Sequence, residues 1–222
     1  LRFLTHLHQM INFNSKLALT PWFSLPSHQK PVAVASTPIT SGFQIRLCTA
    51  ADLAGVAQII AESFHSRDGI WGWAFPLLRL GIYEDLRHRL ATSAPHHVCL
   101  VAVDTSNQAN LNLVATVELS VRLGDAWTYA GTRKSFAYLS NLAVHPQYRR
   151  QGAAFALLNS CEKVAREWGF QDLYLHVLEN NHQARQLYFK LGYRMHQIDS
   201  NWNTFFFRRS RQILLYKHLL DC

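Results

Sequence analysis

The stretch FAYLSNLAVHPQYRRQGAAFALLNSCEKVAREWGFQDLYLHVLENNHQARQLYFKLGY, residues 136–193, decides the fold of this 222-residue chain. Its first part, 136–144, is apolar and ends at His145-Pro146, which predicts a buried strand. After a turn that contains Gly152, apolar residues recur at helical spacing until Gly169, so we expect a long helix. Residues 173–178 alternate as in a second strand, and a short helix follows. A strand, a helix and a strand of these lengths form a βαβ crossover, which predicts two parallel strands and a right-handed connection.

The turn between the first strand and the long helix has the features of an anion site. It places unpaired backbone N–H groups at a helix start, where the helix dipole favours negative charge. Gly152 lets a ligand approach the backbone, and Arg149 and Arg150 add charge that pairs with phosphates. The ATP-binding pattern G-x-x-x-x-G-K-[ST] and the dinucleotide-binding pattern G-x-G-x-x-G are both absent from the sequence. A pyrophosphate site and an ordinary turn with solvated arginines are the two interpretations.

Two blocks in this stretch resemble the GNAT superfamily of acetyl-CoA-dependent N-acetyltransferases. Residues 149–154, RRQGAA, match R/Q-x-x-G-x-G/A with Ala in the last place, and residues 181–193 match N-x-x-A-x-x-L-Y-x-x-x-G-F/Y. The resemblance covers about Phe43 to Leu219 and is specific between Tyr138 and Tyr193. It implies a GNAT fold of the α/β (α+β) class, with a mixed, twisted central sheet of about seven strands flanked by about four helices. The two central parallel strands would splay to admit the pantetheine arm.

The resemblance implies acetyl-CoA as co-substrate, and it assigns the residues that bind it, with no metal. The backbone of Leu142, Ala143 and Val144 would lie along the pantetheine arm. The pyrophosphate would bind in the turn made of Arg149, Arg150, Gln151, Gly152, Ala153 and Ala154. Asn181 would cap the next helix and could also touch CoA. Tyr188 would protonate the departing CoA thiolate, although it could instead be a core aromatic on the apolar stripe of its helix.

An amine must lose a proton before it attacks a thioester, and the candidate base is His176. Tyr138 lies on the neighbouring parallel strand, so both side chains could point into the gap for the thioester. Many GNAT enzymes have a Glu in place of His176, which is a departure from the family pattern. Tyr138, Arg149, His176 and Tyr188 nevertheless match one group of protein N-terminal acetyltransferases, in which a Tyr and a His hold a proton-relaying water. The alternative is a strand histidine satisfied by the backbone.

The acceptor is predicted to be a protein amine. With reference pKa values near 8 and 10.4, presenting a neutral amine at pH 7 costs about 1.4 kcal/mol for an α-amine and about 4.6 kcal/mol for lysine. The sequence of residues 63–90 is most similar to the cyanobacterial and plastid branch of the GNAT superfamily, which includes enzymes acting on both amines. Glu118, an acid within an apolar strand, is a candidate substrate-orienting residue together with Tyr138, or a purely structural carboxylate.

Two rival functions remain beside this one. A small-amine acetyltransferase usually gathers carboxylates, and this chain has only 14 Asp and Glu. A non-catalytic acyl-CoA-binding module would predict a broken base or acid, whereas His176 and Tyr188 are both present. The net charge of +8 and a pI of about 9.6 suit an anionic cofactor, but the basic residues are too scattered to predict nucleic-acid binding. We expect no membrane span, and a monomer or weak dimer.

The remaining segments divide the chain into an extension, 1–42, and a catalytic domain, 43–222. The extension has four prolines and no acidic residue, so it could be a plastid transit peptide or a flexible bacterial extension. The location we expect is a cyanobacterial-like cytoplasm, with the chloroplast as the alternative if residues 1–42 are a transit peptide; four cysteines without metal or pair spacing favour a reducing compartment. We expect strands at 43–47, 97–103, 113–123, 193–198 and 212–219, helices at 53–64 and 77–91, an aromatic segment at 63–76, a polar turn at 104–110 and a basic-aromatic stretch at 205–209.

Overall fold

The computed structural model describes residues 42–64, 75–92, 96–106, 112–123, 135–199 and 211–219. Within them the chain forms a seven-stranded sheet of order β1-β2-β3-β4-β5-β7-β6. The strands are β1 Phe43–Leu47, β2 His97–Asp104, β3 Asn112–Leu123, β4 Ser135–Val144, β5 Asp172–Leu178, β6 Arg194–Asp199 and β7 Gln212–His218. The α-helices are α2 Leu53–Phe64, α3 Phe75–Ala91, α4 Ala153–Glu167 and α5 His182–Lys190, with short 3-10 turns at Ala50–Asp52 and Pro146–Tyr148. The predicted fold class is therefore confirmed.

Every expected strand and helix forms, and each differs from its predicted bounds by two residues at most. The pairing between β4 and β5 is parallel, as the βαβ pattern predicts, and the other neighbours in the sheet are antiparallel. The extension up to residue 41, most of the aromatic segment, the end of the polar turn and the basic-aromatic stretch lie outside the described residues. No helix among the described residues is long and apolar enough to span a membrane.

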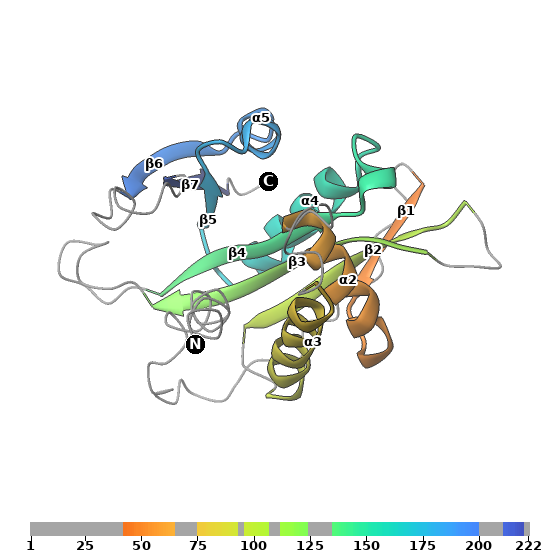
Figure 1. Cartoon of the computed structure of the whole chain (residues 1–222). Coiled ribbons are helices and arrows are strands. Elements are labelled where there is room, and N and C mark those ends of the chain that lie inside the picture. Colours follow the sequence, from red (N-terminus) through yellow and green to blue (C-terminus); the bar gives the residue numbers. More distant parts are fainter. Residues whose placement is uncertain are drawn as a thin grey trace, which may run out of the picture.

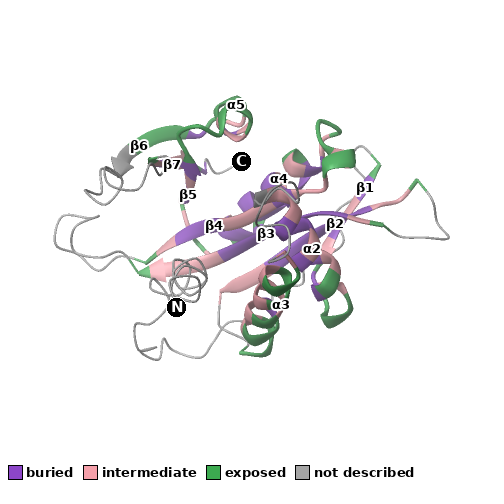
Figure 2. Ribbon diagram, in the orientation of Figure 1, coloured by how far each residue is buried: buried purple, intermediate pink, exposed green. Residues whose placement is uncertain are grey.

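Helices cover both faces of the sheet. The side chains of β2 alternate between two apolar clusters, one on each face. Leu100 and Ala102 pack with the buried residues of α4, whereas Val101 and Val103 pack with those of α2 (Figure 1). The period of two along a strand puts neighbouring residues on opposite faces, so one apolar strand can serve two helical layers. Figure 2 shows the buried residues concentrated along the central strands. The α2 face also carries Glu118 and Tyr138, through the register of β3 with β2 and β4.

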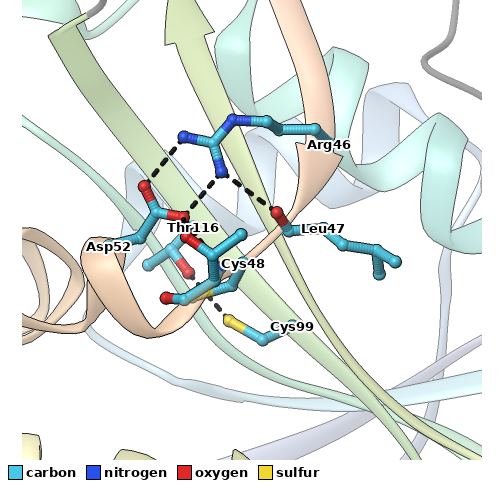
Figure 3. Close-up of polar contacts among 7 residues, drawn as sticks. Arg46, Leu47, Cys48, Asp52, Cys99 and Thr116 are labelled. Atoms are coloured by element: carbon cyan, nitrogen blue, oxygen red, sulfur yellow. Dashed lines mark hydrogen bonds and ion pairs between the residues drawn. The ribbon is translucent and has the colours of Figure 1, made fainter.

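The start of α2 is fixed by a polar junction with β1 (Figure 3). Both terminal nitrogens of Arg46 donate to the carboxylate of Asp52, at 2.6 and 2.8 Å, and the Thr49 amide and hydroxyl donate to it as well. These contacts lower the pKa of Asp52 to about 2, with the Arg46 hydrogen bonds as the main cause. The buried Cys48 and Cys99 lie on adjoining backbone, joined by a 2.8 Å bond from the Cys48 amide to the Cys99 carbonyl. The junction positions the end of β1 against the sheet.

The two parallel strands separate after a short paired segment, as predicted. β4 and β5 pair over Ala137–Leu139 and Leu173–Leu175, although β4 continues to Val144 and β5 to Leu178. Figure 1 shows β5 turning away from β4 beyond this point. On its other side β4 bulges against β3, and Asn141 adopts a left-handed φ of 52° in the bulge. Because a bulge bends the strand that carries it, the irregularity steers β4 away from β5.

Candidate active site

The turn before α4 has the backbone shape of an anion site. Arg150 and Gly152 have φ values of 63° and 93°, and Gly152 is the N-cap of α4. The first amides of α4 have no partner inside the helix, so they face the space beyond its end. Arg149 and Arg150 are exposed there, while the buried Ala153 leaves no side chain across the helix start. Left-handed residues in such a turn can bring successive N–H groups to one concave side, which suits a phosphate.

The segment from Leu142 to Val144 leads from the splay towards this turn. Ala143 and Val144 pair with Thr116 and Ala115 of β3, so one backbone edge is used within the sheet. On the opposite edge, residues 140–144 have no strand partner in the part of the chain that the structure describes. An extended ligand with amide groups could pair with this edge as a further strand does. The predicted pantetheine residues and the predicted pyrophosphate turn are therefore consecutive along one path.

Tyr138 and His176 meet at the end of the paired segment. Tyr138 lies opposite Tyr174 in the register, and His176 is two residues further along the same face of β5. The Tyr138 hydroxyl oxygen and His176 Nδ1 are joined by a hydrogen bond of 2.8 Å. Their ring centroids are 5.7 Å apart. The structure thus brings together the two side chains that the sequence predicts as a proton-transfer pair, where the strands begin to separate.

Tyr188 comes from α5 and is 7% exposed. Burial raises the pKa of Tyr188, and the neighbouring Tyr138 raises it further. Its ring packs edge-on against Tyr193, with centroids 5.7 Å apart. The phenol is protonated at neutral pH, as the predicted proton donor must be, and burial makes its proton harder to release. The ring of Tyr188 belongs to the main core. This is compatible with the predicted role as an acid, because only the hydroxyl is needed for that role.

Asn181 caps the N-terminus of α5, as expected because Asn is a preferred N-cap residue. Its Oδ1 accepts a hydrogen bond of 3.1 Å from the Ala184 amide. Asn181 is exposed. Its contact with CoA remains a prediction.

Glu118 lies inside the protein and is already fully engaged. It is 1% exposed; Oε1 accepts from Asn141 at 2.7 Å, and Oε2 lies 2.7 Å from Arg89 and 3.1 Å from His97. Burial alone would raise the pKa of Glu118, but His97, Arg89 and Asn141 together lower it to about 2. The carboxylate ties α3 and β2 to the bulge of β4. This geometry favours the structural interpretation of Glu118, and its contact with substrate remains an unsupported prediction.

Arg122 is a residue of this site that the sequence analysis did not single out. Its guanidinium carbon lies 3.6 Å from the centroid of the Tyr138 ring. In the register, Arg122 faces Phe136 and Ser120 faces Tyr138, so Arg122 is on the Tyr138 face of the sheet. The signal in the sequence was the alternation of side chains along β3, which places every second residue, here Glu118, Ser120 and Arg122, on one face. Without the register between β3 and β4, this alternation could not bring Arg122 to Tyr138.

Comparison with known proteins places this geometry in a family. Residues 56–193 match the model of the acetyltransferase (GNAT) family. The chloroplastic GCN5-related N-acetyltransferase 10 of Arabidopsis thaliana is 28% identical over 172 residues, which are 75% of this chain and 67% of that protein. The chloroplastic GCN5-related N-acetyltransferase 7 of the same plant is 35% identical over 80 residues, 36% of this chain and 29% of that protein.

A solved structure has the same fold. Arabidopsis thaliana NAA60, crystallised in complex with acetyl-CoA, superposes with a TM-score of 0.57 at 20% identity, over 80% of this chain and 98% of that one. The family model covers more than half of the chain, including the splay, the turn before α4 and α5. The chain therefore belongs to the acetyltransferase (GNAT) family of N-acetyltransferases.

Proposed function

We propose that this enzyme transfers the acetyl group of acetyl-CoA to protein amines, chiefly N-terminal α-amines and also the ε-amine of lysine. The observation that carries the proposal is the hydrogen bond of 2.8 Å between the Tyr138 hydroxyl and His176 Nδ1. It lies at the point where β4 and β5 separate, next to the path that a pantetheine arm would take. A paired phenol and imidazole can hold and relay a proton without a carboxylate base.

Acetyl-CoA fits the groups along the path. Its pyrophosphate would accept hydrogen bonds from the amides of the 149–154 turn, with Arg149 and Arg150 beside it. Its pantetheine amides would pair with the open edge of Leu142–Val144, which directs the thioester to the start of the splay. The chloroplastic relatives and NAA60 carry acetyltransferase names or acetyl-CoA, and they support the assignment. In the described residues no cluster of His, Cys, Asp and Glu could hold a metal ion.

The reaction balances with these residues alone. The neutral amine attacks the carbonyl carbon of the thioester, and the C–S bond breaks as the C–N bond forms. The amine proton passes through water to His176, which Tyr138 orients through the hydrogen bond to Nδ1. The departing CoA thiolate takes a proton from Tyr188, whose burial keeps it protonated until that moment. Direct transfer of this kind needs no covalent acyl-enzyme.

The preference for α-amines follows from the free energy that is needed to deprotonate the acceptor amine. At pH 7 deprotonation costs about 1.4 kcal/mol for an α-amine and about 4.6 kcal/mol for the ε-amine of lysine. An imidazole is a base of moderate strength, which serves the first amine more readily. Lysine acetylation is then a slower activity of the same site.

The decisive test uses two peptide sets with the purified full-length chain and acetyl-CoA. One set has free N-termini and no lysine, and the other has blocked N-termini and one internal lysine. Acetylation of the first set, with slower acetylation of the second, is the expected result. Bound acetyl-CoA without acetylation of either set would refute the protein acceptor and favour a small-amine acceptor or an acyl-CoA-binding role.

The chloroplast is the location we propose, with residues 1–42 as a transit segment ahead of the catalytic domain at 43–222. The acid-free composition of 1–42 and the chloroplastic names of the relatives support it over the cytoplasmic alternative. A fluorescent protein fused behind residues 1–42 should enter plastids in plant cells. Uniform cytosolic fluorescence would refute the transit role.

A further inference from the structure

Arg122 holds a fixed positive charge on the acceptor side of the site. The acyl donor would run from the turn before α4 along Val144 to Leu142, so its thioester end points towards the paired segment of β4 and β5. Arg122 lies beyond that end, on Tyr138 and towards Phe136. Its guanidinium is 3.6 Å from the Tyr138 ring centroid, so it lies within about two peptide residues, roughly 7 Å, of the hydroxyl. A bound acceptor amine would therefore be close to this cation.

No carboxylate in the described part of the chain neutralises Arg122. The carboxylates on its side of the sheet already have basic partners: Glu118 has Arg89 and His97, Asp85 has Arg89, and Asp172 has His218 at 2.9 Å. Burial lowers the pKa of the guanidinium, yet an arginine stays charged at neutral pH. Burying a cation without a contacting carboxylate is costly, and a ligand with a carboxylate would offset that cost.

We propose that Arg122 selects acceptors by charge: it favours amines that have a carboxylate within the first two residues and disfavours acceptors with further positive charges. The inference rests on the proposed function and narrows its substrate class to neutral or acidic N-termini. Polyamines and lysine-rich N-termini would place a second cation close to Arg122, and the two like charges would repel each other. Acidic N-termini would instead bring a carboxylate to Arg122, which forms no ion pair with a carboxylate among the described residues.

The test measures kcat/KM of the full-length enzyme for three peptides that differ only at the second residue, which is Glu, Gln or Lys. The wild-type enzyme should prefer Glu over Lys by about a factor of ten or more, and 0.5 M salt should reduce the ratio. Arg122→Gln should reduce the Glu-to-Lys ratio about tenfold, with the rate on the Gln peptide as the reference within each variant, whereas Arg122→Lys should keep the preference. Arg166→Gln, which removes the same charge from α4 on the opposite face, is the matched control and should leave the ratio unchanged.

Each of the following outcomes would overturn the inference or its basis. An unchanged Glu-to-Lys ratio in Arg122→Gln refutes selection by charge, and so does an equal loss on all three peptides, which would make Arg122 only a support for Tyr138. If Arg122→Gln does not fold, as judged by thermal unfolding and acetyl-CoA binding, a wild-type ratio near one or insensitive to salt refutes it as well. Failure of the wild-type enzyme on every peptide refutes the proposed function itself, and the inference with it.

Discussion

At the residue scale, the site consists of side chains whose roles differ because their surroundings differ. The phenols of Tyr138 and Tyr188 are equally buried, at 7% exposure. Tyr138 is bonded to an imidazole and covered by a cation, whereas Tyr188 packs against Tyr193 in the core. The first environment suits a proton relay, and the second suits an acid that stays protonated. Position alone would thus give two identical side chains the two different roles that we propose for them.

Loss of the relay should slow turnover without releasing the co-substrate. Tyr138→Phe and His176→Ala should lower kcat by about 10²–10³ fold, because each removes one end of the proton path. Acetyl-CoA binding should change less than threefold, since neither side chain lies on the 142–154 path. Single-turnover kinetics and calorimetric titration with acetyl-CoA separate the two effects. Losses of binding and rate by equal factors would mean that the pair is only structural.

At the scale of elements, the turn before α4 depends on one glycine. Gly152 has a φ of 93°, where a side chain costs about 1–2 kcal/mol and would also stand at the mouth of the amide cluster. Gly152→Ala should therefore weaken acetyl-CoA binding at least tenfold. Gly169, just after α4, is the matched control, because its φ is 83° and a Cβ there would meet nothing within 4 Å. Gly169→Ala should lower the melting temperature by a similar strain but leave acetyl-CoA affinity unchanged. Equal effects of the two substitutions on affinity would contradict a binding role for the turn.

The sequence predicted these elements well because their signals are local. Periodicity, Gly169 and Asn181 determine where α4 and α5 end or begin, and the order of strand, helix and strand determines the parallel pairing. The bulge of β4 was not predictable from local pattern, since it depends on the register against β3 and on Asn141, which adopts a positive φ. Arg122 on Tyr138 and the three partners of Glu118 are likewise products of register. These contacts therefore escaped prediction, whereas the Tyr138–His176 contact between the two parallel strands was expected from the sequence.

At the scale of the whole molecule, one buried carboxylate connects three separate elements around the candidate site. Glu118 on β3 contacts Arg89 of α3, His97 of β2 and Asn141 of β4. Its position links the covering helix to the bulge that opens the splay. Such a network stabilises the fold only while the carboxylate is ionised, because protonation removes the charge that Arg89 and His97 need. Stability should consequently depend on pH through this residue.

The sign of that dependence follows from the lowered pKa. Glu118 has a pKa of about 2 in the folded protein against an ordinary value of 4.5. A lowered pKa contributes stability that is fully present above pH 4.5 and is lost as the pH falls towards 2; its size is on the order of 3 kcal/mol. Urea unfolding at pH 7, 5, 4 and 3 should show wild type losing stability faster than Glu118→Gln, so the two curves converge in acid. Glu84→Gln, which removes an exposed pair with Arg87, is the control and should run parallel to wild type at every pH. Parallel curves for Glu118→Gln would show that the network holds the fold by packing and hydrogen bonds rather than by charge.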